Sequence, residues 1–177
     1  DNPVSEFYGA LGFKSELGLF KFNEKNSLSI FKPKMLIKIS PNDSRDLSKD
    51  STSLSYSDLF KLNKVKTIDK VDTGSNISLG FDFKINNLNN DNEIESEQFK
   101  FSIGQIISAE ENRDMPSKST LNEKMSDIYG EASINLNENI KISNSFLLDQ
   151  NLEKFNKNQV DLGIIYPKTS FNLSFLE

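Results

Sequence analysis

Four closely spaced lysines are the residues in this sequence whose type and spacing most clearly suggest chemistry. They are Lys61, Lys64, Lys66 and Lys70, and they share one polar stretch. A lysine ammonium group binds phosphate or another anion as a compact point charge. The same spacing is also typical of a solvated loop face, because exposure is the default state of a charged side chain. The cluster therefore predicts either an anion-binding loop or a simple solvent-exposed connection.

Side chains for catalysis and metal binding are scarce. The 177 residues include no cysteine and no histidine, so disulfides, thiolate ligands and the usual general base are all missing. The acidic and amide-rich run at residues 89–93 lacks the glycine and the ligand spacing of a calcium loop. We expect no enzyme activity, no cofactor and no metal site.

Composition and charge narrow the class of protein further. The formal net charge of -5 and the pI near 4.9 argue against nucleic acid as a partner, since phosphate backbones require a clustered excess of lysine and arginine. The 14 phenylalanines favour a folded chain over a disordered one. The sequence begins at Asp1 without methionine and ends within an alternating segment. We therefore expect residues 1–177 to be a fragment of a single domain.

Alternation of apolar and polar residues is the strongest structural signal. From position 76 one face is apolar and the other polar, namely Ile77, Leu79, Phe81, Phe83 and Ile85 against Ser78, Gly80, Asp82 and Lys84. Similar alternation occurs at residues 7–22, with a slip in phase near Gly18, and at residues 30–40, 99–103, 128–136, 140–148, 160–166 and 171–175. Residues 128–136 and 140–148 form the clearest hairpin. The pattern predicts an all-β, antiparallel up-and-down meander of roughly six to eight strands.

The connections between these strands alternate in length. Shorter ones at residues 23–27, 86–97 and 137–139 interleave with long loops at about residues 41–72 and 110–125. Outer-membrane barrels have short turns at one end and long loops at the other. A soluble β-sandwich or β-solenoid with uneven loops produces a similar alternation of apolar and polar residues, because antiparallel sheets often have one solvent-exposed face. Pattern alone leaves both architectures open.

The long connection at residues 41–72 contains one strongly apolar pair, Leu59 and Phe60. Connections of this length are usually functional or disordered. We expect the pair to fold back as an anchor, while residues 61–70 stay exposed to solvent.

Several groups of residues, in order along the chain, resemble the LptD family of outer-membrane lipopolysaccharide-assembly proteins. The most informative group runs from Leu59-Phe60 through Leu62-Asn63, Asp69, Asp72 and Gly74 to a strand that contains Gly80. The others are Phe31-Lys-Pro-Lys-Met-Leu-Ile-Lys-Ile-Ser-Pro-Asn42, the strand end Phe101-Ser-Ile-Gly104-Gln105, and the loop and strand at residues 112–130. Together they cover residues 31–148.

The resemblance implies a partial segment of a large transmembrane β-barrel in the outer membrane of a Gram-negative bacterium. Such a barrel receives lipopolysaccharide from periplasmic bridge proteins and inserts it into the outer leaflet, with an LptE-like lipoprotein plug inside. The positions of the family motif are Leu59, Phe60, Asn63, Asp69, Gly74, Gly80, Gly104 and Gln105. Lys61, Lys64, Lys66 and Lys70 would then contact phosphates of the anionic lipid.

The same resemblance gives the two strand faces different surroundings. Rows such as Ser78, Asp82 and Lys84, or Glu131, Ser133 and Asn135, would line a hydrated interior, because polar side chains are costly against acyl chains. The opposite rows would contact outer-membrane lipid. The disulfide cysteines and lateral-gate strands of the family have no counterpart in this segment.

Two other functions remain open at this stage. One is a segment of another outer-membrane barrel, such as a porin or an importer, and a lipoprotein partner would distinguish the two. The other is a soluble β-rich adhesin or binding module, which would not depend on detergent. An isolated barrel segment should instead aggregate in plain buffer, since its terminal strands carry unpaired backbone groups.

Overall fold

A computed structural model describes residues 8–23, 26–41, 45–51, 53–65 and 70–177. The strands are β1 (Leu11–Glu16), β2 (Leu19–Asn23), β3 (Ser27–Ile39), β4 (Asn76–Leu88), β5 (Ile94–Ser108), β6 (Ile128–Asn137), β7 (Ile140–Leu148), β8 (Phe155–Tyr166) and β9 (Thr169–Leu176). Two short 3-10 turns, η1 (Tyr56–Phe60) and η2 (Ser117–Ser119), lie in the long loops. The predicted all-β antiparallel meander is confirmed. The described residues form nine strands, more than the six to eight predicted, since the predicted segment at residues 7–22 is divided between β1 and β2.

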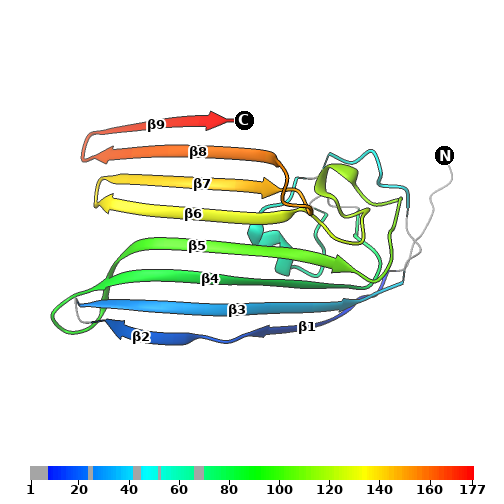
Figure 1. The fold of residues 1–177 in the computed structure, drawn as a ribbon, viewed down its shortest axis with the longest axis horizontal. Helices are drawn as coiled ribbons and strands as arrows, with labels where there is room; N and C mark the ends of the chain where they lie inside the picture. The colour runs from blue at the N-terminus through cyan, green and yellow to red at the C-terminus, as the bar shows by residue number, and fades with distance from the viewer. Residues whose placement is uncertain (1–7, 24–25, 42–44, 52, 66–69) are drawn as a thin grey trace.

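All nine strands belong to one open sheet in which neighbours along the chain are neighbours in space (Figure 1). The exception is the edge formed by β1 and β2, which both pair with β3. Their register is continuous, since Glu16 lies opposite Lys34 and Leu19 lies opposite Phe31. The apolar pattern slips near Gly18 because apolar side chains change from one face of the sheet to the other there. The pairing with β3 does not shift.

The register gives the sheet one apolar and one polar face. The face we call the apolar face carries rows of large side chains, with Phe31 opposite Phe83 and Phe83 opposite Phe101. Neighbouring rings on it approach closely, with centroids 5.1 Å apart for Phe31 and Phe81. On the other face, the polar face, the predicted residues Ser78, Asp82, Lys84, Glu131, Ser133 and Asn135 do lie together, because strand residues two apart share a side.

The connections alternate strictly in length between the two ends of the sheet. The short connections, from β2 to β3, β4 to β5, β6 to β7 and β8 to β9, occupy one end, and the longer connections, from β3 to β4, β5 to β6 and β7 to β8, occupy the other. The predicted connection at residues 86–97 is too long, because β4 continues to Leu88 and β5 begins at Ile94. Register shifts after Ile85 and Asn87 interrupt the alternation there, which hides the strand ends from a pattern search.

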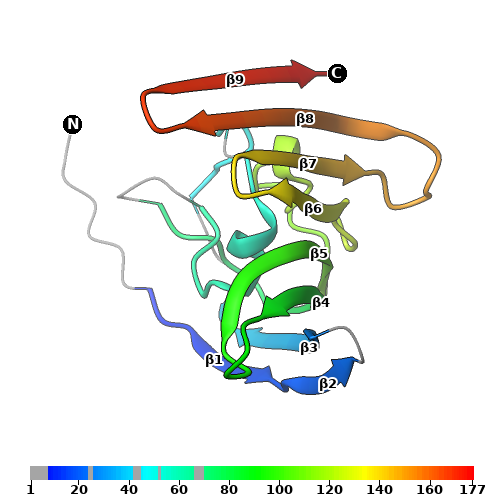
Figure 2. The same ribbon diagram turned by 90° about the vertical axis from the view of Figure 1, so that its left-hand side faces the viewer.

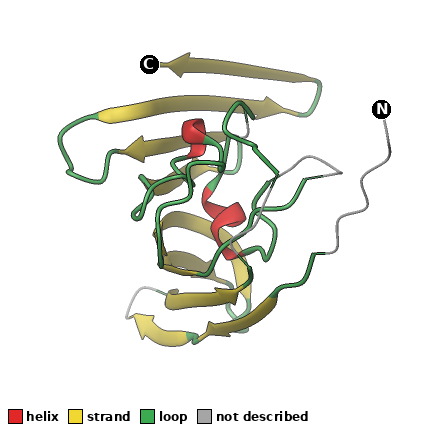
Figure 3. Ribbon diagram, turned by 90° about the vertical axis from the view of Figure 1, so that its right-hand side faces the viewer, coloured by secondary structure: helices red, strands yellow, loops and turns green. Residues whose placement is uncertain are grey.

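The protein's buried core lies between the long loops and the polar face. The sheet curves around these loops, and both 3-10 turns lie on its concave side (Figures 2 and 3). The core residues are Leu36, Leu47, Leu54, Tyr56, Leu59, Phe60, Val65, Ile106, Met115, Leu121 and Tyr129. Most of them come from the described parts of the loops, which are therefore packed against the sheet. Within the described part of the chain, no helix is long and apolar enough to span a membrane.

Candidate functional site

Two glycines on the polar face form the seat on which the first long loop rests. Gly80 of β4 lies directly opposite Gly104 of β5. A Cβ atom at Gly104 would lie 3.0 Å from Leu59 Cδ1, and one at Gly80 would lie 3.0 Å from Phe60 Cζ. Only glycine leaves room for so close an approach. Four of the predicted motif positions thus meet in one contact, and the predicted anchor role of Leu59 and Phe60 agrees with their burial.

The turn that presents this pair is held by a buried carboxylate. Asp58 Oδ2 accepts hydrogen bonds from the backbone N–H of Ser55 at 2.8 Å and from its hydroxyl at 2.7 Å. Lys61 Nζ donates to the other oxygen, Asp58 Oδ1, at 2.7 Å. The bond from the Ser55 N–H is the one that the N3 carboxylate of a capping box accepts from the N-cap residue. The turn is therefore held in shape by hydrogen bonds among its own residues.

A cation and an anion of the sheet lie beside the same turn. Lys34 Nζ is 2.6 Å from Asp82 Oδ2 and lies 5.5 Å from the ring centroids of both Tyr56 and Phe60. The two rings meet edge to face at 5.5 Å. Burial and the neighbouring Asp82 carboxylate raise the pKa of the Tyr56 hydroxyl well above its usual range, so this tyrosine stays neutral.

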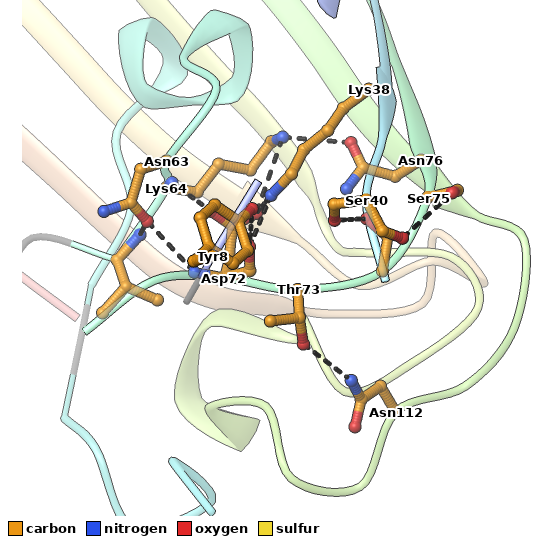
Figure 4. A network of polar contacts seen from close by, with 12 residues as sticks. Tyr8, Lys38, Ser40, Asn63, Lys64, Asp72, Thr73, Ser75, Asn76 and Asn112 are labelled. Carbon is orange, nitrogen blue, oxygen red and sulfur yellow. Dashed lines mark hydrogen bonds and ion pairs between the residues drawn. The ribbon is translucent and has the colours of Figure 1, made fainter. Parts of the chain in front are cut away.

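A second group of contacts joins the end of the loop to β3 and β4 (Figure 4). Lys38 Nζ forms an ion pair with Asp72 Oδ2 at 2.8 Å, and the side chains are only 0% and 3% exposed. Asp72 Oδ1 accepts the backbone N–H of Lys64 at 2.7 Å. Lys64 Nζ donates to Asn76 Oδ1 at 3.0 Å. We call Lys38, Lys64, Asp72 and Asn76 the buried polar cluster.

The motif residue Asn63 positions this cluster. Its side-chain oxygen accepts the backbone N–H groups of Val65 at 3.2 Å and Asp72 at 3.1 Å. Its amide nitrogen donates to the carbonyl of Lys70 at 3.0 Å. One side chain thus joins two parts of the loop that lie on either side of residues 66–69.

Lys64 is the most perturbed titratable group of the buried polar cluster. Its pKa is lowered to about 8, chiefly by desolvation; the Asp72 carboxylate opposes this change and the nearby Lys38 ammonium adds to it. A lysine in this position has no contact with water, because its side chain is 0% exposed. Burial therefore disfavours the charged form of Lys64, whose Nζ acts in the loop as a hydrogen-bond donor to Asn76.

The second long loop is tied to the first and to the sheet. The motif residue Gln105 donates from Nε2 to the carbonyl of Ser126 at 2.7 Å. Leu47 N–H donates to the carbonyl of Asp114 at 2.7 Å, which joins the two loops. Gly74 has a φ of 88°, a conformation that favours glycine, and its N–H donates to the carbonyl of Pro41 at 2.9 Å. The two loops therefore form one folded unit over the long-loop end of the polar face.

The four predicted lysines do not form one exposed cluster. Lys61 is exposed and paired with Asp58, and Lys70 lies 2.8 Å from Asp50 Oδ2. Lys64 is buried, so the prediction that residues 61–70 all stay in solvent is wrong for it, and it cannot reach a lipid phosphate in this structure. The reason is the pair of acceptors, Asp72 and Asn76, which sequence spacing could not place beside it. Lys66 and the motif position Asp69 lie outside the described residues.

Sequence reasoning missed several residues of the site. Asp58, Tyr56, Lys34 and Lys38 were not among the predicted site positions, although each contacts the loop anchor or the buried polar cluster. A signal was present for the lysines. Both alternate with apolar residues in β3 and so share a face with the carboxylate of Asp82 in the neighbouring strand.

Ion pairs continue across the polar face below the loops. Lys84 Nζ is 2.5 Å from Glu97 Oε2, and Lys100 Nζ is 3.6 Å from Glu131 Oε2. Towards the short-turn end a polar hollow of about 1220 Å³ opens, lined by residues that include Asn135, Lys141 and Asp161. Among the described residues no group of acidic side chains is arranged to hold a metal ion. The polar face can accommodate a hydrated, charged partner.

The fold and the site define an open, two-faced antiparallel meander whose long loops fold onto its polar face. The family described as LptD, LPS transport system D, matches residues 9–177. The chain belongs to this family. None of the curated proteins matches the chain.

Proposed function

We propose that this chain forms part of the wall of a larger outer-membrane β-barrel that inserts lipopolysaccharide into the outer leaflet. Family membership supports a role in lipopolysaccharide transport. The observation that carries the barrel-wall proposal is the division of the sheet into two faces. On the apolar face, side chains such as Phe13, Phe171 and Phe175 are more than half exposed, which is unusual for a contiguous surface in water and typical of strands that contact lipid.

The polar face is then the interior of the barrel. Its ion pairs and amides are compatible with water and with sugar or protein partners, and they would be costly against acyl chains. The partners we propose are lipopolysaccharide, an LptE-like lipoprotein plug and periplasmic bridge proteins, all in the outer membrane of a Gram-negative bacterium. The protein acts by guiding its lipid and carries out no catalysis.

The folded loops cover the long-loop end of this part of the barrel wall on its inner side. Leu59 and Phe60 hold η1 against Gly80 and Gly104, and the buried polar cluster holds the end of the loop. Of the predicted lysines that the structure describes, exposed Lys61 and partly exposed Lys70 can contact anionic lipid headgroups. The long-loop end is the one expected to face outward, since outer-membrane barrels have their longer loops on the outer side.

Two neighbouring positions in the middle of β8 test the proposal. Val160 lies on the apolar face, opposite Asn144 and Phe175, whereas Gln159 lies on the polar face and hydrogen-bonds Asp161. In the complete protein, Val160→Lys should lower the free energy of unfolding by about 2–4 kcal/mol if the site is near the middle of the bilayer. Gln159→Lys should be tolerated, because the new ammonium can pair with Asp161.

Cells that depend on the variant protein supply the functional readout. Val160→Lys should reduce the amount of assembled protein and of lipopolysaccharide at the cell surface, and Gln159→Lys should leave both near the wild-type level. Equal tolerance of lysine at the two positions would contradict the assignment of one face of β8 to the membrane. Normal surface lipopolysaccharide in cells that lack the protein altogether would favour a porin, an importer or a binding module.

A further inference from the structure

Two phenylalanines break the division of the sheet into apolar and polar faces. Because β1 and β2 pair with β3 in one continuous register, Phe20 lies opposite Ile30 and Phe22 lies opposite Leu28. These positions share the polar face with Lys32 and Lys34, since alternate residues of β3 point to the same side. Phe20 and Phe22 are nevertheless 65% and 68% exposed. They form an apolar surface on the face where the sequence elsewhere places charges and amides.

The two rings belong to a larger group at the short-turn end of the sheet. The group consists of Phe20, Phe22, Leu28, Ile30, Leu88 and Ile94, and we call it the inner apolar patch. Leu28 and Leu88 are buried and form its floor, whereas Ile94 is 57% exposed. The patch therefore has a packed base and exposed side chains above it.

Charged residues border the patch and leave one cation without a partner. A hollow of about 330 Å³ is lined by Ile30, Ile94, Lys32, Lys84, Asp82 and Glu97. Lys34 neutralises Asp82 at 2.6 Å, and Lys84 neutralises Glu97 at 2.5 Å. Within the described part of the chain, Lys32 has no hydrogen bond or ion pair, although it lies across from Asp82 in the ladder. The border of the patch thus carries one free positive charge.

We propose that the inner apolar patch binds the acylated, phosphorylated end of the transported lipopolysaccharide, with an acyl chain on Phe20 and Phe22 and a phosphate at Lys32. This inference rests on the proposed function, because it names the site where the lipid would touch the wall. A hydrocarbon chain has no polar groups that need partners, so it can lie on a shallow patch of side chains. A phosphate complements the charge that Asp82 and Glu97 leave unbalanced.

Crosslinking in the complete, detergent-purified protein with its natural partners tests the proposal. The photoreactive residue p-benzoylphenylalanine replaces Phe22. As a matched control it replaces Lys21, the preceding residue in β2, whose side chain lies on the opposite face of the sheet. The probes are purified lipid A with its phosphates and the same lipid after enzymatic dephosphorylation, in a neutral detergent. Lipid adducts are measured by mass spectrometry, and Lys32→Ala and Lys32→Arg are combined with the label at position 22.

The expected result is an adduct at position 22 that depends on charge. Lys32→Ala and removal of the phosphates should each lower it by about two- to fivefold, the range for a partly exposed ion pair, and Lys32→Arg should preserve it. Adducts at position 21 should respond to neither change. Equal adducts at both positions, insensitive to Lys32, would show simple partition from detergent and overturn the proposal.

Labelling in living cells separates this idea from the function on which it rests. If position 22 crosslinks only to a polypeptide, the patch is a protein-docking surface and the lipid assignment is wrong. If surface lipopolysaccharide still depends on the protein while position 22 gives no lipid adduct, the proposed function stands and the patch assignment fails.

Discussion

Gly80 and Gly104 face each other across the β4–β5 ladder, and the loop residues Phe60 and Leu59 occupy the space above them. The contact brings together four positions, distant in the sequence, that the resemblance in the sequence singled out. A strand interior usually loses stability when it contains glycine. Here the missing side chains let the first long loop approach the backbone of the sheet.

Adding a single methyl group to this seat should loosen the loop. At Gly104 the new Cβ would lie 2.9 Å from the Leu79 carbonyl oxygen and 3.0 Å from Leu59 Cδ1, so Gly104→Ala should cost about 1–3 kcal/mol through overpacking. Chemical unfolding of the complete protein in detergent measures this cost. Gly9→Ala is the control, because nothing lies within 4 Å of its new Cβ. An equal effect of the two variants would contradict the role of the seat.

Removing the apolar anchor should release the same loop from the sheet. Leu59→Ser with Phe60→Ser removes two buried side chains, each of which contributes about 2–5 kcal/mol when it lies in a core. Faster proteolysis within residues 45–65 and greater outer-membrane permeability to bulky antibiotics are expected. Leu62→Ser, in the same loop but nearly half exposed, should have little effect. If the double variant assembles and changes neither measurement, Leu59 and Phe60 do not anchor the loop.

The buried ion pair should be worth far more than a surface pair of the same type. Asp72→Ala leaves Lys38 buried without its counter-charge and Lys64 N–H without its acceptor, which should cost about 3–5 kcal/mol. Glu16→Ala removes the more exposed pair with Lys14 and should cost at most about 1 kcal/mol. If the two variants lose the same free energy of unfolding, the Asp72 carboxylate is in contact with water and its ion pair is not a buried one.

The pH dependence of loop docking should follow Lys64. Its pKa in the folded protein is lowered to about 8, below the value in the unfolded chain. The unfolded state therefore binds more protons between these two pKa values, and docking becomes more stable as pH rises through about 8. Asp72 and Lys38 are the charged groups that face it. Hydrogen exchange in the loop, corrected for the intrinsic effect of pH, measures the change.

A variant without the titrating group provides the comparison for this pH profile. Lys64→Met retains much of the side-chain volume and removes the charge, so docking of its loop should lose the rise in stability above pH 8. Parallel profiles for the two proteins would assign the pH dependence to another group.

The strands could be predicted from the sequence because their pattern is local. Ile77, Leu79, Phe81 and Phe83 alternate with polar residues, and each side of the sheet has its own environment, so period-2 alternation survives along β4. The β4–β5 turn was predicted too long because the ladder shifts register beyond Ile85. The side on which Phe20 and Phe22 lie depends on pairing with β3, which no local pattern contains.

The site was only partly predictable for a similar reason. Leu59 and Phe60 are conspicuous because they are apolar in a polar loop, and their burial follows from that contrast. Lys64 belongs to the same loop and looks like a solvated lysine. Its burial depends on Asp72 and Asn76, which the folded loop brings to it from positions 8 and 12 residues further on.

The assignment of the two faces is tested most directly by nitroxide labels placed one at a time at positions 158–164 of β8, in the complete protein in lipid bilayers. Collision with oxygen reports contact with lipid, and collision with a water-soluble nickel chelate reports contact with water. Oxygen access is expected at 158, 160, 162 and 164, and chelate access at 159, 161 and 163, because consecutive strand residues point to opposite faces. Chelate access at every position would show that the apolar face is not embedded in a membrane and would contradict the assignment of β8 to a barrel wall.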